Sequence, residues 1–451
     1  MARILAALIV STSLAHAALA TAQADPGSEP RRPEPRAVPD YDGRGAPPED
    51  PAEPWMWIPR VATAPLYLVT EYLLRAPIGW LLTELEATGA ITSLANYLRR
   101  DFVVLPVAYF DLGLRPSVRL FATWKHALHD ANQIDVSAGF GGTGALDARV
   151  VDTITVDDLS VSARFRASRR DDYIYGGVGP GADNTIANRA RFSEARLETE
   201  ARLDWRFWRR SRLRLSTGYD SRSFGDGEEL GDPALTTRQQ QLADGVLPEG
   251  FEDGYSAFRA RLELVMDTRA VSRSLDGGVR VGVYAAPGFD VDRPSQRRWL
   301  TWGGHLMLAT DALGAERVLA LEGDAHLVED LDASEGVPFT ELIDPSAAGV
   351  LPAYLPGQLR GRSAAAMTVR YRWPIWVFLD GNLFFSVGSV FDTRFDGFEL
   401  HDLRYSFGVG VDARDAGDHP FVFQLGVGSE TFANGGELTS FRVLIGARNS
   451  L

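Results

Sequence analysis

Apolar and polar residues alternate with a period of two from residue 102 onward. In residues 195–207 the odd positions are apolar apart from Thr199, and the even positions are all Arg, Glu or Asp. A helix cannot separate this pattern onto two faces, whereas a β-strand does so automatically. The run is longer than the roughly 5–6 residues of a typical strand. It is long enough for a tilted membrane-spanning strand, which needs about 9–11 residues.

The same alternation recurs along the chain and predicts about 16 strands. The predicted strands are 102–110, 114–124, 132–140, 145–154, 158–168, 193–207, 211–222, 255–267, 276–289, 299–311, 316–329, 364–373, 377–392, 402–412, 419–430 and 438–448.

One face of these strands carries many Arg and Glu residues, and the other face is apolar. This arrangement is typical of a barrel with a polar lumen and a lipid-facing exterior. Short connections at 208–210, 312–315 and 374–376 alternate with long ones at 169–192, 223–254 and 330–363. The pattern predicts an all-β fold, a transmembrane antiparallel β-barrel over 101–451, with a periplasmic C-terminus and long outer loops.

The N-terminus has the pattern of a secretory signal peptide over 1–24. Arg3 precedes an apolar stretch, Ile4 to Ala20, which is followed by small-residue sites up to Ala24. The alternative is a transmembrane anchor, which the short and weakly hydrophobic stretch disfavours. Residues 25–54 are rich in Pro, Gly, Asp and Glu, which predicts a disordered linker. Export and the barrel together predict the outer membrane of a Gram-negative bacterium.

Residues 55–100 are apolar but are interrupted by Pro59, Pro65 and Pro77, which predicts a short helical periplasmic segment. Glu71 and Arg75 argue against a membrane-spanning helix. Two interpretations remain for this segment. It is either a helical plug or collar packed on the barrel, or an interfacial segment on the inner leaflet of the outer membrane.

Charge and composition exclude several classes of protein. The net charge is −14, whereas nucleic-acid binders are usually basic. The charged fraction of 24% is too high for a bundle of membrane-spanning helices. Cysteine is absent, which excludes disulfides and thiolate metal sites.

Several segments of 100–451 resemble the barrel domain of the outer-membrane assembly-factor superfamily, the bacterial surface antigen (BamA/TamA-like) family. They are YGGVGP at 175–180, DTR at 267–269, VPFTEL at 337–342, LRG at 359–361, VRYRWPI at 369–375 and LFFSVGSVF at 383–391. The family's periplasmic POTRA modules have no counterpart in 25–100, which is Pro-rich linker and helix.

The resemblance implies that Leu359, Arg360 and Gly361 form the tip of the sixth outer loop, which folds back into the lumen. Arg362, Arg370 and Ser386 depart from the family pattern, since Ser386 stands where the family often has Asp. A partly buried Arg needs an acidic partner. Asp380 is on the same strand face as Ser386, so we expect Asp380 and Ser386 on the inner wall, with Asp380 as the partner of Arg360.

The chain offers no convincing catalytic or metal site, so we expect no enzyme activity, cofactor or metal. No G-x-S-x-G motif occurs. His126 and His129 have no third ligand nearby in sequence, and His401, Asp402 and Ser406 lie on one strand or its start, whereas a triad converges from separate elements. The acidic loop 225–232 could hold Ca²⁺ through oxygen ligands, although a solvated outer loop explains it as well.

Three functions fit these observations. The resemblance favours a BamA/TamA-like barrel that assists protein or lipid insertion or translocation. The charged lumen would also suit a porin-like general diffusion channel, and a structural surface barrel is the third alternative. The expected partners are outer-membrane lipid, lipopolysaccharide and, during biogenesis, the barrel-assembly machinery, with no nucleic acid. The sequence identifies no client.

Overall fold

A computed structural model describes one N-terminal helix and most of the chain from residue 100 onward. The described residues are 70, 72, 76–89, 93, 96–98, 100–182, 189–227, 231–241, 246–269, 277–311, 317–331, 336–376, 379–413 and 421–447. The expected signal peptide (1–24) and linker (25–54) lie outside them.

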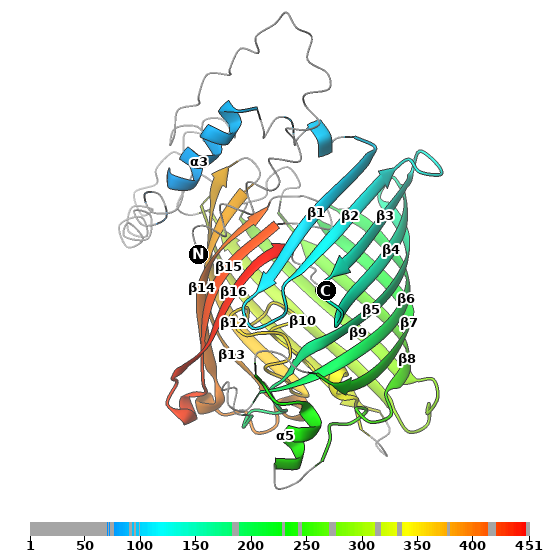
Figure 1. Cartoon of the computed structure of the whole chain (residues 1–451). Helices are drawn as coiled ribbons and strands as arrows, with labels where there is room; N and C mark the ends of the chain where they lie inside the picture. The colour runs from blue at the N-terminus through cyan, green and yellow to red at the C-terminus, as the bar shows by residue number, and fades with distance from the viewer. Residues whose placement is uncertain are drawn as a thin grey trace, which may run out of the picture.

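Sixteen antiparallel strands form a closed barrel in which each strand pairs with its sequence neighbours and the last pairs with the first (Figure 1). They are β1 (Phe102–Asp111), β2 (Ser117–Lys125), β3 (Asn132–Phe140), β4 (Ala145–Val156), β5 (Leu159–Tyr175), β6 (Ala190–Trp208), β7 (Ser211–Asp226), β8 (Tyr255–Asp267), β9 (Gly278–Asp290), β10 (Arg298–Thr310), β11 (Val318–Asp330), β12 (Ser363–Trp376), β13 (Leu379–Phe391), β14 (Arg404–Ala413), β15 (Phe421–Ser429) and β16 (Leu438–Ala447). The predicted all-β barrel of about 16 strands is confirmed.

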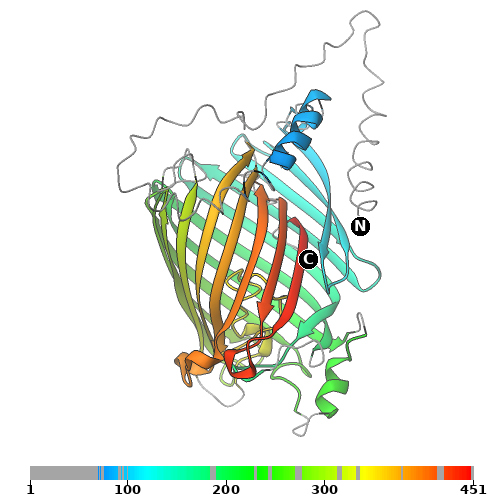
Figure 2. The same cartoon turned by 90° about the vertical axis from the view of Figure 1, so that its left-hand side faces the viewer.

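The helices are short and lie between strands or before the first one. They are α3 (Ala76–Ala87), α5 (Leu235–Gln241), η4 (Phe339–Glu341), η5 (Thr393–Phe395), η6 (Leu400–Asp402) and η7 (Phe432–Asn434). α3 and α5 mark opposite ends of the barrel (Figures 1 and 2). The three longest connections, β5–β6, β7–β8 and β11–β12, all lie at the α5 end.

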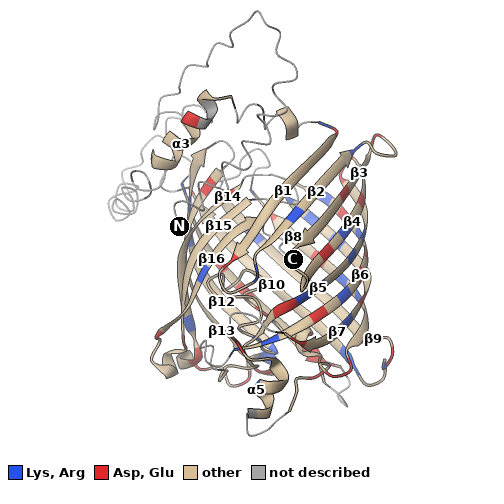
Figure 3. Cartoon of the chain, viewed as in Figure 1, with Lys and Arg blue, Asp and Glu red and all other residues tan. Residues whose placement is uncertain are grey.

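Alternate side chains of each strand face the lumen and the outside. On β6, Leu203 and Trp205 point outward and are 38% and 48% exposed, whereas Glu198 points inward and is 8% exposed. Charged residues accordingly recur at every second position along β6, from Glu194 to Arg206 (Figure 3). The apolar outer surface is the one that contacts lipid.

β5 is longer than the sequence pattern predicts. The predicted strand ends at 168, but β5 continues to Tyr175. The four charged residues 169–172 interrupt the alternation, and the register with β6 shifts between Arg170 and Tyr173. Such a β-bulge changes which residues share a face, so a strict period of two fails there. The predicted long connection 169–192 is correspondingly shorter.

α3 packs on the outside of the barrel near the end of β12. Pro77 occupies its first turn, where a missing N–H costs nothing. Leu82 is buried in one apolar cluster with Trp373, Ile375 and Trp376 of β12. Most of the rest of 55–75 lies outside the described residues. In the part of the chain that the structure describes, no helix is long and apolar enough to cross a membrane.

The assignment of faces predicts the effect of a single Arg. Leu203→Arg places a guanidinium on the lipid-facing surface, which costs about 2–4 kcal/mol near the bilayer midplane. Gln133→Arg is the matched control, because Gln133 faces the lumen and its amide donates a hydrogen bond to Asp135 at 2.9 Å. In lipid vesicles, Leu203→Arg should lower the free energy of unfolding and the yield of heat-modifiable barrel, while Gln133→Arg should do neither. Equal effects of the two would show that the faces are assigned incorrectly.

Candidate functional site: the inward-folded loop and the β1–β16 seam

The connection between β11 and β12 folds into the lumen. Within its described residues, 336–362, most side chains are shielded from solvent. Leu351, Ala353 and Tyr354 have no exposed surface, and Phe339 and Leu359 have 1% each. We call residues 336–362 the lumen loop. Its side chains pack on the inner wall in two places, which lie on opposite sides of the barrel.

The first anchor of the lumen loop is an aromatic cluster around Phe339. Its ring centroid lies 5.2 Å from Phe192, 5.0 Å from Phe224, 6.0 Å from Tyr175 and 6.2 Å from Phe251. Aromatic pairs at such separations add stabilisation beyond the burial of their area. β5, β6 and β7 contribute Tyr175, Phe192 and Phe224, so the loop is fixed to the extended ends of these strands.

Glu341 adds an ionic contact to this anchor. Its carboxylate lies 2.9 Å from Arg259 of β8 and 3.5 Å from Arg222 of β7. It also accepts a hydrogen bond from the Tyr255 hydroxyl at 2.6 Å. Charge-assisted hydrogen bonds of this kind are stronger than neutral ones.

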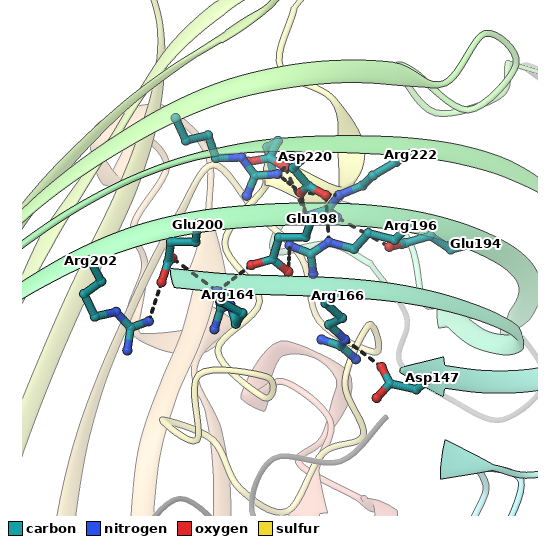
Figure 4. Close-up of polar contacts among 12 residues, drawn as sticks. Asp147, Arg164, Arg166, Glu194, Arg196, Glu198, Glu200, Arg202, Asp220 and Arg222 are labelled. Carbon is teal, nitrogen blue, oxygen red and sulfur yellow. Dashed lines mark hydrogen bonds and ion pairs between the residues drawn. The ribbon is translucent and has the colours of Figure 1, made fainter. Parts of the chain in front are cut away.

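Arg222 and Arg259 belong to a larger network of ion pairs on the wall formed by β4 to β8 (Figure 4). Both contact Asp220, which also pairs with Arg196 at 2.8 Å. The network continues from Arg196 through Glu198 and Glu200 of β6 and Arg164 of β5, and a separate ion pair joins Arg166 of β5 to Asp147 of β4. Each charge therefore has an opposite charge beside it, as groups removed from bulk water require.

Arg360 lies beside the aromatic cluster. It is 7% exposed, and its guanidinium carbon lies 5.2 Å from the Phe339 ring, 5.5 Å from Phe192 and 6.0 Å from Tyr175. Burial lowers the pKa of Arg360, and the negative charge of Asp344 opposes that shift. Burial likewise raises the pKa of Asp344, and the charge of Arg360 opposes this. Among the described residues, Asp344 is the acidic group whose charge acts most strongly on Arg360, and Glu194 acts in the same direction.

The backbone around Arg360 joins two of the sequence motifs. Gly179 N–H donates to the Arg360 carbonyl at 2.8 Å, and Gly176 N–H donates to the Gly357 carbonyl at 3.1 Å. Gly357 has φ +86°, which favours glycine at this reversal of the chain. The YGGVGP segment (175–180) and the LRG segment (359–361), which are far apart in the sequence, are thus in direct contact.

The structure does not bring Asp380 to Arg360. Gly361 lies against Val390, since a Cβ on Gly361 would be 2.8 Å from the Val390 Cβ. Asp380 is ten residues away on the same strand, which is about 33 Å at 3.3 Å per residue. Both Asp380 and Ser386 are buried, and Ser386 accepts a hydrogen bond from Thr368 at 2.8 Å. The expected ion pair between Arg360 and Asp380 does not form. The alternation along β13 predicts which residues face the lumen, but it does not predict how far along the barrel axis each of them lies from Arg360.

The second anchor of the lumen loop is on β14 to β16. The Tyr354 hydroxyl donates to the carbonyls of Ser429 at 2.7 Å and Tyr405 at 3.1 Å. Arg442 of β16 donates to the carbonyls of Pro352 at 3.2 Å and Tyr354 at 2.9 Å. The wall is rich in glycine here because the loop lies against its backbone. A Cβ on Gly428, for example, would be 2.6 Å from the Tyr354 ring.

Arg442 also joins β16 to β1. Its guanidinium donates to both carboxylate oxygens of Asp111, from Nε to Oδ1 and Oδ2 at 3.1 Å each and from Nη2 to Oδ2 at 2.7 Å. Asp111 has no exposed surface and also accepts from the Tyr109 hydroxyl at 3.2 Å. One side chain therefore contacts the lumen loop, β16 and β1.

The pairing of β1 with β16, which we call the seam, is short. Among the described residues its register comprises Phe110 with Ile445 and Asp111 with Leu444. One further backbone hydrogen bond runs from Leu112 N–H to the Val443 carbonyl at 2.9 Å. By comparison, the register of β1 with β2 runs over all of residues 102–109. Over the rest of β1 the described residues show no register with β16, but this edge is partly covered. Gly446 lies against the backbone of Ala108 and Tyr109, and the Tyr97 hydroxyl donates to the Val104 carbonyl and accepts from the Val104 N–H, both at 2.9 Å.

The residues considered for other chemistry do not converge. His126 lies in the β2–β3 turn, where its ring contacts the Asp130 carbonyl, and His129 contacts the Ala131 N–H. His401 is exposed beside Asp402, whereas Ser406 is fully buried on β14. In the acidic loop, Asp226 accepts from Thr236 and Asp232 pairs with Arg191. Among the described residues, no group of three His, Asp or Glu side chains is placed to hold a metal ion.

Comparison with known proteins shows the fold. No protein-family model matches the chain, and no curated protein is similar to it in sequence. The structure is similar to that of BamA from Haemophilus ducreyi lacking POTRA domains 1–3, with 13% identity and a TM-score of 0.53, over 77% of this chain and 70% of that one. It also matches CdiB from Acinetobacter baumannii, with 9% identity and a TM-score of 0.46, over 76% of this chain and 59% of that one. The chain thus has the barrel fold of outer-membrane proteins such as BamA.

The position of Arg360 predicts coupling with Asp344 but not with Asp380. Arg360→Met or Asp344→Asn alone leaves one buried charge uncompensated, which costs about 3–5 kcal/mol. The double variant should destabilise the closed lumen loop little more than either single variant does, so the changes in the free energy of loop opening should be strongly non-additive. The rate of proteolysis within the lumen loop of folded barrels measures its opening.

Asp380→Asn provides the control for this double-mutant cycle of Arg360 and Asp344. Combined with Arg360→Met it should give additive effects, because the two groups are far apart. Additive effects in the Asp344 cycle, or coupling in the Asp380 cycle, would contradict the observed arrangement.

Proposed function

We propose that the chain resides in the outer membrane of a Gram-negative bacterium and assists the insertion or translocation of proteins or lipids there. In this proposal the seam is the functional element, because it is the weakest part of the barrel wall. The short β1–β16 register is the observation that carries the proposal. The apolar exterior contacts phospholipid and lipopolysaccharide, and the barrel-assembly machinery inserts the chain during biogenesis.

The edge of β1 supports this function physically, because among the described residues the side chain of Tyr97, and not a second strand, bonds to this edge at Val104. Unpaired N–H and C=O groups are costly in lipid, so the edge of β1 favours a strand that pairs with it. Both faces of β1 are apolar over residues 102–107, and an apolar strand or acyl chain could lie beside them. Pro106 lacks an N–H and is tolerated on an edge strand. It limits how continuously a second strand can pair.

The lumen loop argues against a general diffusion channel. It crosses the interior from the β5–β8 wall to the β14–β16 wall, and both of its anchors are buried. The space left between the loop and the β6–β11 wall is a cavity of about 650 Å³, lined in part by Arg259, His305 and Glu341. Such a cavity suits water and small ions better than the passage of large solutes.

Locking the seam tests the proposed function. Because the chain has no cysteine, Phe110→Cys with Ile445→Cys introduces a single disulfide between paired residues of β1 and β16. Liposomes of phosphatidylethanolamine and phosphatidylglycerol that contain the protein should accelerate the folding of a urea-unfolded eight-stranded barrel. The oxidised variant should lose this acceleration, and reductant should restore it. Heat-modifiable gel migration of the added barrel measures its folding.

Leu203→Cys with Leu215→Cys provides the control disulfide, because these residues are paired in the continuous β6–β7 register. It should leave the acceleration unchanged. The proposal would be wrong if the native protein gave no acceleration for either the added barrel or fluorescent phospholipid transfer, or if both disulfides acted alike.

Conductance distinguishes the proposed function from a diffusion channel. Native protein in planar bilayers should conduct little, because the lumen loop is anchored on two walls. Phe339→Ala combined with Glu341→Gln should release the first anchor and produce larger, fluctuating current steps. Leu197→Ala on the lipid-facing surface is the control and should not change the current. A large, steady current through the native protein would favour the porin-like alternative.

A further inference from the structure

The burial of two lipid-facing aromatic residues identifies an external helix-docking site. On β12, Met367 and Val369 point outward and are 60% and 46% exposed. Tyr371 and Trp373 continue the same outward face, yet they are 4% and 0% exposed. Whatever covers them must lie outside the barrel rather than in the lumen.

α3 accounts for part of this cover. Leu82 and Ile78 of α3 belong to the same apolar cluster as Tyr371 and Trp373. The cluster also includes Leu379 and Leu383 of β13 and Val409 and Val411 of β14, which are outward-facing by register. α3 therefore contacts the outer surface of β12 to β14 at one end of the barrel, and it extends from there beyond the ends of these strands (Figures 1 and 2).

The opposite side of α3 is also largely apolar, with Glu84 as its charged residue. Trp80 and Leu81 are 63% and 45% exposed, and the helix contains only three polar residues, Thr83, Glu84 and Glu86. Thr83 satisfies its hydroxyl within the helix by donating to the Gly79 carbonyl at 2.9 Å. A helix that is apolar on both sides is expected to be buried on both sides or to lie in a membrane.

The barrel surface next to α3 indicates what covers this second side. Val369 of β12, Phe385 of β13 and Phe407 of β14 continue the docking face along the same strands and remain 42–49% exposed. These positions belong to the lipid-facing surface of the barrel. Lipid that covers them also reaches the helix lying on the same surface.

We propose that α3 is a monotopic anchor that places Trp80 and Leu81 in the periplasmic leaflet, in contact with phospholipid acyl chains and glycerol groups. Tryptophan is typical of the membrane–water interface, and an interfacial helix buries its apolar side by about 5–10 Å. Glu84 lies one turn from Trp80 and keeps that side of the helix near water. The helix brings no basic residue, so the contact is apolar and does not depend on anionic lipid.

Spin labels at single cysteines test the proposal in the full-length chain. Leu81→Cys is the reporter, Met367→Cys is the lipid-facing reference, and Asp130→Cys in the exposed β2–β3 turn is the aqueous reference. In vesicles of phosphatidylethanolamine and phosphatidylglycerol, the label at position 81 should be more accessible to oxygen than to a water-soluble nickel chelate, as at position 367. High salt should not change this ratio.

A second substitution separates lipid contact from simple docking. Trp80→Glu should shift the Leu81→Cys label toward the aqueous reference, whereas Glu84→Gln should leave it in lipid. Heat-modifiable migration of each variant establishes that the barrel itself is folded. A native label as exposed to nickel as that at Asp130→Cys would overturn the proposal. Spin–spin broadening between labels would overturn it too, by assigning this face to a second copy of the chain.

Discussion

Closure of the barrel is the constraint on which the rest of the structure depends, because an unpaired strand edge in lipid has neither water nor a backbone partner. In this protein the closing register is two residue pairs long among the described residues, and it is reinforced by the ion pair between Arg442 and Asp111. The same guanidinium donates to the loop carbonyls of Pro352 and Tyr354. Folding of the lumen loop and closure of the wall therefore depend on one side chain.

The two walls that hold the lumen loop use different chemistry. The β4–β8 wall is dense in charge, and its ion pairs satisfy one another in a site where an unpaired charge would be expensive. On the β14–β16 wall Gly426 and Gly428 leave room for Ala353 and the Tyr354 ring of the loop, whereas Gly408 and Gly410 leave room for Phe384 and Asn382 of β13. The loop is thus fixed by charge and aromatic rings on one side and by backbone fit next to the seam on the other. Release at the seam side would not require breaking the charged network.

The strands could be predicted well from the sequence, because in a strand between lipid and lumen the apolar and polar residues must alternate. The prediction failed at the β-bulge after Arg170, where the alternation is interrupted. It also failed for the partner of Arg360, because that contact depends on how the loop folds inside the barrel. Parity placed Asp380 on the inner wall, but only the folded loop brings Asp344, which precedes Arg360 in the same loop, near enough for its charge to act on Arg360. The outward aromatic residues Tyr371 and Trp373 gave no sign in the sequence that a helix covers them.

The positions of the seam and of α3 separate two tasks around the barrel. The docking site of α3 is on β12 to β14, whereas the seam joins β1 and β16, so β15 lies between them in the sheet order. A helix fixed to β12–β14 stiffens the wall on one side of the seam without covering the seam itself. The β2–β5 side has no such external helix among the described residues. Opening at the seam would then move β1 and its neighbours more readily than β14 and β13, because the latter carry both α3 outside and the anchored loop inside.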